Sequence, residues 1–267
     1  MRDAMITSLV SDLTDIDVQN CRPVVLYING EYYGLYYIRE KISQNYVAGH
    51  YNCKPEDTVV CAASGRTSEE YQALISYVTS HDLSVKENYD YVCSIVDVDD
   101  YAEYIIAEMI IANTDNGNIK FFKTKEGKWR WIMYDVDQSF RAVADPTLSD
   151  HLNPAGTGAG NMFPTRLINA LLKNPDFKDM FIRKMAWQLE NMWAVDVVEK
   201  YINEFDNTIK EEMKRDCERW NHPYTNYTNG VEALRSFISQ REAKFVPQVK
   251  SYFGLTDEQM REYGFKV

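Results

Sequence analysis

The sequence lacks the short motifs of several common site types. None of its cysteines forms a CxxC pair, which argues against a structural zinc site. Its four histidines show no HxxH or HExxH spacing, and no GxSxG nucleophile elbow is present. A glycine-rich phosphate loop of the usual kinase or P-loop kind is also missing. Zinc hydrolases, serine hydrolases of that type and ordinary nucleotide-binding loops are therefore disfavoured.

Basic residues and long apolar runs are also scarce. The chain has 29 Lys and Arg against 40 Asp and Glu, a formal net charge of −11, so a duplex nucleic acid partner is not expected. The longest apolar stretch, Ile105 to Ala112, is interrupted by Glu108 and is too short to span a bilayer. The five cysteines are widely spaced, and we interpret them as buried free thiols. A disulfide such as Cys53 with Cys61 stays open if the protein is exported.

The first part of the chain predicts a helix followed by a β-hairpin. Apolar residues recur at helical spacing over Asp3 to Leu13. Strands are expected over Val24 to Ile28 and Tyr32 to Ile42, because Asn29-Gly30 between them tolerates the positive φ angles of a type I′ turn. Gly34 within the second strand indicates a bulge or a close approach of another backbone.

The rest of the chain predicts more helix than strand. Length and composition suit one domain over residues 1–267, which we expect to be a piece of a longer protein. The order of elements favours an α+β fold over alternating βαβ units. Expected elements are a helix after Ser43, a strand over Thr58 to Ala62, helices from Ser68 to Thr79 and from Asp97 to near Asn113, a loop over 142–161, and helices over Phe163 to Leu172, Asp176 to Met192, Val195 to Trp220 and Val231 to Phe253.

A second hairpin carries the candidate site. Its strands are expected over Ile119 to Lys123 and Trp129 to Tyr134. Folding the chain symmetrically about Glu126-Gly127 brings residues before the first strand beside residues after the second. Three carboxylates and a carboxamide then gather at one end of the ribbon, where adjacent strands lie ~5 Å apart. These residues are Asp115, Asn118, Asp135 and Asp137.

Carboxylates held this close repel one another unless a cation neutralises them. Because all the candidate ligands are oxygen atoms, we expect Mg²⁺, Mn²⁺ or Ca²⁺ in place of Zn²⁺. Metal-dependent phosphotransfer uses an Asp near the acceptor hydroxyl and an Asn and a second Asp on the metals. Asp and Asn also form ordinary turns, but their pairing with an Asp-x-Asp at the opposite strand end favours a site.

Three segments of the chain resemble the spore coat protein H (CotH) kinase family, an atypical branch of the protein-kinase-like fold. The resemblance covers roughly residues 1 to 240. It rests on Arg2-Asp3-Ala4, on Val25 to Lys41 (VLYINGEYYGLYYIREK), and on Asn113 to Phe122 (NTDNGNIKFF) followed by Trp131 to Phe140 (WIMYDVDQSF).

The resemblance implies phosphorylation of protein Ser or Thr residues by ATP with Mg²⁺ or Mn²⁺. It makes Asp115 the catalytic residue, and Asp135, Asp137 and Asn118 the metal ligands. In many family members the segment between this Asp and Asn is longer, so either Asn118 or Asn116 faces the metal. The family occurs on bacterial spores and in exported multidomain proteins, which implies an exported, cell-surface or spore-associated protein.

The resemblance also implies a two-lobed molecule. Residues 1–65 then belong to a β-hairpin N-terminal lobe that covers the nucleotide, and residues 66–267 form the metal-site hairpin and a mainly helical C-terminal lobe. Glu40 matches a Glu that the family places at the end of the returning strand. Arg39 and Lys41 lie on the opposite face of that strand. With Arg2 and Arg66 they are candidate phosphate contacts, and the alternative for each is a solvated surface charge.

Two other functions stay open. One is a non-catalytic kinase-like or Ca²⁺-stabilised binding module of an exported or cell-surface protein, which the short Asp115-to-Asn118 segment favours. The other is a glycosidase that uses paired carboxylates ~5–10 Å apart. The preferred prediction is a protein serine/threonine kinase with a protein substrate, and thus an enzyme that uses ATP and a divalent metal.

Overall fold

The computed structural model of the chain describes residues 1–63, 67–115, 117–154 and 165–267. It is a mixed α+β structure, as the sequence predicts, with small sheets and many helices. The strands are β1 (Asp17–Val18), β2 (Cys21–Ile28), β3 (Glu31–Arg39), β4 (Thr58–Ala62), β5 (Lys120–Thr124) and β6 (Arg130–Met133). The helices are α1 (Arg2–Leu13), α2 (Gln44–Tyr51), η1 (Pro55–Asp57), α3 (Glu69–Ser80), α4 (Lys86–Ile95), α5 (Val98–Ile110), α6 (Thr147–His151), α7 (Arg166–Leu171), α8 (Pro175–Asn191), α9 (Val195–Trp220), α10 (Tyr224–Phe253) and α11 (Asp257–Tyr263).

The hairpin of β2 and β3 forms a sheet of its own. Asn29 and Gly30 have φ angles of 51° and 84°, as a type I′ turn requires. The pairing shifts register between Leu26 and Tyr27, so a bulge lies next to Gly34. β3 ends at Arg39, and the predicted extension to Ile42 is wrong because Ile42 turns into a small apolar cluster with α2.

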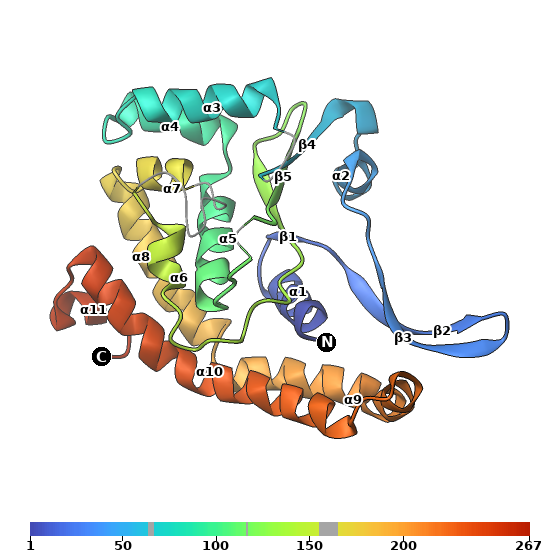
Figure 1. The fold of residues 1–267 in the computed structure, drawn as a ribbon. Coiled ribbons are helices and arrows are strands. Elements are labelled where there is room, and N and C mark those ends of the chain that lie inside the picture. The colour runs from blue at the N-terminus through green and yellow to red at the C-terminus, as the bar shows by residue number, and fades with distance from the viewer. Residues whose placement is uncertain (64–66, 116, 155–164) are drawn as a thin grey trace.

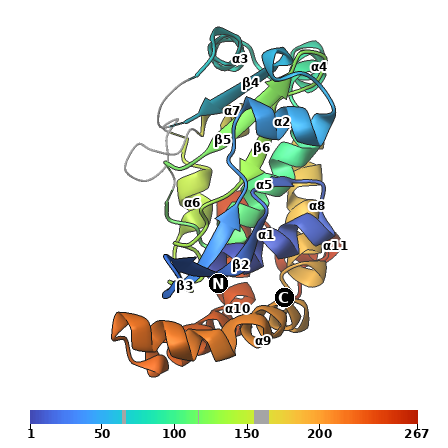
Figure 2. The ribbon, with the colours of Figure 1, turned by 90° about the vertical axis from the view of Figure 1, so that its right-hand side faces the viewer.

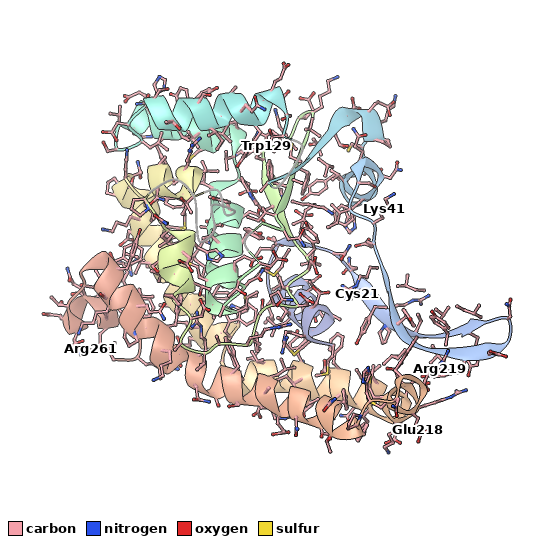
Figure 3. The ribbon with its side chains drawn as sticks, in the orientation of Figure 1. Cys21, Lys41, Trp129, Glu218, Arg219 and Arg261 are labelled. Carbon is pink, nitrogen blue, oxygen red and sulfur yellow. The ribbon has the colours of Figure 1, made fainter. Side chains whose placement is uncertain are left out.

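The hairpin stands out from the rest of the molecule above one end of α9 (Figure 1). The backbone N–H of Leu35 donates to the Asp216 carboxylate on α9 at 2.7 Å. Gly34, at φ +151°, allows this contact, since a Cβ there would lie 2.8 Å from the same carboxylate oxygen. Arg219 approaches the Tyr33 ring from the end of α9, where Figure 3 labels it. The expected bulge at Gly34 is confirmed, and the close approach there is made by the Asp216 side chain and not by another backbone.

The second sheet contains the predicted hairpin of β5 and β6. Its strand order is β1-β6-β5-β4, with β1 parallel to β6 and the other pairs antiparallel. Lys120 pairs with Ile132 and Phe122 with Arg130, so the ribbon is centred on Glu126, within one residue of the expected fold about Glu126-Gly127. β4 has the predicted bounds and lies at one edge.

Each face of this sheet is buried by different helices. Phe121 and Trp131 point into the main core, where the Trp131 ring lies 4.2 Å from the Tyr101 ring of α5. Phe122 and Ile132 point the other way, into the smaller cluster with α2. Figure 2 shows the sheet in the upper half of the molecule, with α9 and α10 along the lower edge.

The Arg130 side chain of β6 joins its neighbouring strand β1 and the start of α5. Its guanidinium donates to Asp17 at 2.9 Å, Asp97 at 2.6 Å and Asp100 at 2.7 Å. Burial raises the pKa of Asp100 to about 8, although the charge of Arg130 opposes that rise. One guanidinium therefore holds β1, β6 and the start of α5 together.

Arg241 on α10 fixes the other end of α5. Its fully buried guanidinium donates to the carbonyl oxygens of Met109 at 2.7 Å and Ile110 at 2.9 Å, and to that of Val143 at 2.7 Å. Burial lowers the pKa of Arg241 to about 10. The carbonyls of Met109 and Ile110 are the last of α5 and carry the negative end of the helix dipole, so the cation satisfies groups that the helix itself leaves open.

Most helices follow their predicted signals. Ser68 and Asp97 cap α3 and α5 with their side chains, and Pro175 occupies the first position of α8. The sequence missed α4 and α11, and it missed α6 within the expected loop 142–161, of which residues 155–161 lie outside the described residues. α5 ends at Ile110, three residues before the predicted end. α10 begins at Tyr224 and not at Val231.

The structure also bears on a disulfide and on a membrane-spanning helix. No disulfide joins any of the five cysteines, all of which are described. Within the described part of the chain, no helix is long and apolar enough to cross a bilayer.

Candidate functional site

The register of β5 and β6 brings the predicted residues to one end of the ribbon. The Asn118 amide donates to the Asp135 carboxylate, and the Tyr134 hydroxyl donates to the Asn118 carbonyl oxygen at 2.7 Å. The pKa of Asp135 is raised, first by partial desolvation and then by the charges of Asp137, Asp3 and Asp115. Of the predicted carboxylates, Asp137 and Asp115 therefore both lie close enough to Asp135 to repel it.

The backbone at Asp135 has the left-handed conformation. Its φ angle is +55°, which Asp adopts more readily than most residues but which still carries strain. The next side chain, Val136, is fully buried in the core, while Asp135 and Asp137 stay exposed on either side of it. The buried Val136 side chain therefore anchors this segment to the core, and the Asp135 and Asp137 carboxylates stay at the surface on either side of it.

Asp3 holds this segment, and sequence reasoning did not single it out. One oxygen of its buried carboxylate accepts from the Val136 N–H at 2.9 Å, and the other forms an ion pair with Arg39. A single side chain of α1 thus joins the β3 end to the Asp135 segment. The signal in the sequence was a carboxylate within an apolar helical pattern, inside the Arg2-Asp3-Ala4 segment.

The predicted nucleotide-binding residues divide into those that lie at the site and those that do not. Arg39 is linked to the site by its ion pair with Asp3, and the Arg2 guanidinium donates to the Asp137 carbonyl oxygen at 2.8 Å. Glu40 points elsewhere: its carboxylate accepts from the Asn20 N–H at 3.0 Å and contacts His50 at 2.9 Å. Alternation along the strand explains the difference, because neighbouring residues face opposite sides.

The remaining two candidates have no described contact with the hairpin end. Lys41 is exposed on the connection between β3 and α2, where Figure 3 labels it. Arg66 lies outside the described residues, as does Asn116. Asn118, the described one of the two asparagines that could face a metal, lies beside Asp135.

Asp115 rests on a buried polar network that begins in α5. The Asn113 side-chain carbonyl accepts from the Asp115 N–H at 3.1 Å, and its amide donates to Glu108 at 2.7 Å. Glu108 is only 4% exposed. Burial raises its pKa to about 7, and hydrogen bonds from Asn113 and Tyr104 oppose that rise. Sequence reasoning noted Glu108 only as an interruption of an apolar run.

The donor set suits a hard divalent cation. Carboxylate and carboxamide oxygens are the ligands that Mg²⁺ and Mn²⁺ prefer. The Asp135 pKa is raised mainly by partial burial and further by neighbouring carboxylates, and a cation would relieve that second, repulsive contribution. Among the residues that the structure describes, no group of three or more His, Cys, Asp or Glu side chains converges as a ready metal site. A cation here would therefore depend on Asn118 and on phosphate oxygens as well as on carboxylates.

The chain is similar in sequence to a known protein family. The family model described as CotH kinase protein matches residues 1–245 of the 267. No curated protein matches the sequence. The family match spans α1, both hairpins and most of the helical part, so it includes every residue that forms the candidate site.

Proposed function

The chain belongs to the CotH kinase family, and from this premise we propose that it is a protein kinase that transfers the γ-phosphate of ATP to Ser or Thr residues of a protein. The family match supports kinase-like function in general. The choice of acceptor residue and the need for Mg²⁺ or Mn²⁺ belong to the proposal.

One observation carries it: Asn118 contacts Asp135 at the same hairpin end as Asp115 and Asp137. These are the parts that phosphotransfer requires, namely a carboxylate for the acceptor hydroxyl and oxygen ligands for the metals that bridge the phosphates. In the proposal Asp115 takes the first role, and Asp135, Asp137 and Asn118 take the second. A bound divalent metal would neutralise charge on the phosphates.

The residues then act as follows. The acceptor hydroxyl oxygen forms a bond to the γ-phosphorus, the bond from that phosphorus to the β–γ bridging oxygen breaks, and ADP leaves. Asp115 accepts the hydroxyl proton. Asn113 keeps the Asp115 backbone in place during the transfer, since it holds the Asp115 N–H. Arg39 and Arg2 contribute positive charge beside Asp3 and Asp137.

A two-lobed arrangement is part of the same proposal. Residues 1–65 with the β2–β3 hairpin form the nucleotide-covering portion, and residues 66–267 form the metal-site hairpin and the helical lobe. The exported, cell-surface or spore-associated location also stays a proposal.

The test measures transfer of radiolabelled γ-phosphate from ATP with Mn²⁺ to the chain itself and to a general protein substrate. Asp115→Asn and Asp135→Asn are expected to lower the rate about a hundredfold or more, because each removes a carboxylate that acts in the transition state. Asp196→Asn, on the exposed first turn of α9, is the matched control and keeps the wild-type rate. Unchanged activity in both site variants would refute the proposal.

One observation favours a non-catalytic module as the second candidate. Both polar atoms of the Asn118 side chain are already bonded, to Tyr134 and to Asp135, so this amide has a role without any metal. Thermal shift separates the two functions. Stabilisation by ATP with Mn²⁺ supports the kinase, whereas stabilisation by Ca²⁺ alone and none by nucleotide supports a Ca²⁺-stabilised binding module.

A further inference from the structure

The basic side chains near the hairpin end differ in how far other groups already neutralise or bond them. Arg39 is paired with the buried Asp3 carboxylate. Arg2 donates to a backbone carbonyl, and the charge of Arg141 lies close enough to lower its pKa further after burial. A phosphate at this site therefore needs a cation that is neither neutralised nor turned to solvent.

Lys120 is placed to supply that charge. It is the first residue of β5 and lies directly opposite Ile132, so both side chains point to the same face of the sheet. Tyr134 follows two residues after Ile132 and shares this face. The Lys120 ammonium lies 4.4 Å from the centre of the Tyr134 ring. The hydroxyl of that ring binds Asn118, which in turn binds Asp135.

The Lys120 ammonium has no carboxylate partner among the described residues. No Asp or Glu oxygen in residues 1–63, 67–115, 117–154 or 165–267 lies within 4.0 Å of it, although the charge of Asp135 acts on it from further away. Lys123 on the same strand differs, because it pairs with Glu70 at 3.2 Å.

We propose that Lys120 is the cation that binds the phosphate groups of the nucleotide, beside the metal that Asp135 and Asn118 would hold. This inference rests on the proposed kinase function. A lysine binds phosphate as a compact point charge, and the oxygens of a bound nucleotide would satisfy an ammonium that the described residues leave without a counter-ion. Lys41 and Glu40, which the family resemblance favours for this region, then have no direct part in phosphate binding.

The Tyr134 contact offers a purely structural alternative. A lysine that lies over an aromatic ring gains a cation–π interaction, and this alone would explain its position. The two roles predict different effects when Lys120 is substituted. If Lys120 is only structural, its substitution changes the stability of the protein with or without nucleotide. If Lys120 binds phosphate, its substitution changes the affinity only for ligands that carry phosphate.

The experiment measures binding of ATP, ADP and adenosine to the full chain by calorimetry with Mn²⁺ present. Lys120→Met is expected to weaken the binding of ATP and of ADP at least about tenfold, because a charge-assisted contact to phosphate is lost. Its affinity for adenosine stays unchanged. Lys120→Arg keeps ATP affinity within about threefold, since it keeps the charge. Lys123→Met and Lys41→Met behave as wild type.

Each outcome decides between the proposals. Circular dichroism and the melting temperature without ligand verify that Lys120→Met is folded, and if it is not, Lys120→Arg and Lys120→Gln replace it in the comparison with adenosine. Wild-type ATP affinity in folded charge-removing variants overturns the role of Lys120 and leaves the kinase proposal intact. Equal weakening of ATP and adenosine also overturns it. Absence of nucleotide binding by the wild-type chain overturns the kinase proposal and this inference together.

Discussion

Replacing Glu108 by Gln should remove a pH dependence from the stability of the protein. The Glu108 carboxyl is buried and bonded to Asn113, and burial raises its pKa from 4.5 to about 7. A carboxyl whose pKa is raised on folding holds its proton more tightly in the folded state. Its contribution to stability is therefore complete below pH 4.5 and is lost as the pH rises to 7 and above.

The size of the effect follows from the pKa difference. Each unit corresponds to about 1.36 kcal/mol, so ionising Glu108 in the folded protein costs about 3 kcal/mol of unfolding free energy by pH 8. The glutamine of the variant has no proton to lose and still offers an oxygen to the Asn113 amide. Because a small part of this is already lost at pH 5, the free energy of unfolding of Glu108→Gln, minus that of the wild type, should rise by about 2.5 kcal/mol from pH 5 to pH 8.

Urea denaturation followed by tryptophan fluorescence at about pH 5, 6, 7 and 8 measures this difference. The raised pKa of Asp100 adds its own pH dependence, but that contribution is the same in both proteins and cancels in the subtraction. Glu190→Gln, at an exposed pair with Lys266, is the control and should give a difference that is flat within about 0.5 kcal/mol. A flat difference for Glu108→Gln as well would refute the reasoning from burial.

Three further substitutions test the contacts that position the site. Gly34→Ala should destabilise the protein by about 1–3 kcal/mol, measured by denaturation, because the new methyl group meets the Asp216 carboxylate at 2.8 Å and φ is +151°; an unchanged midpoint would contradict the close approach. Arg130→Met should cost about 3–5 kcal/mol by leaving three aspartates without their shared cation, and urea denaturation should show a smaller loss at pH 5 than at pH 8, in keeping with the raised pKa of Asp100. Asp3→Asn should keep the acceptor for the amide of the Asp135 segment but lose the ion pair with Arg39, so the rate of phosphate transfer should fall more than the melting temperature, and wild-type kinetics would show that this ion pair has no part in the site.

Both hairpins were predictable because their signals are local. The Asn29-Gly30 turn and the alternation of apolar residues around Glu126-Gly127 each depend on neighbours in the sequence. The register of the second hairpin fixed which residues meet at its end, so the contact of Asn118 with Asp135 followed from symmetry alone.

What the sequence did not predict depends on distant contacts. Residues 224–230 (YTNYTNG) are weak helix formers, yet they begin α10 because the Tyr227 hydroxyl bonds Asp206 on α9 at 2.6 Å. The role of Asp3 likewise exists only once α1 lies beside Val136. The opposite directions of Glu40 and Arg39 followed from strand alternation, but their partners, Asn20 and Asp3, lie elsewhere in the chain and could not be predicted from the strand alone.

The buried Arg241 side chain sets an order on folding. Its bonds to the last carbonyls of α5 join residues 131 and 132 positions apart in the chain. During synthesis, α5 and the Asp115 segment leave the ribosome long before Arg241 does, and α5 exposes apolar residues on nearly all sides until then. The end of α5 that precedes the site can therefore pack against Arg241 only after α10 has been made. Until then the nascent chain exposes apolar surface that can aggregate or bind chaperones.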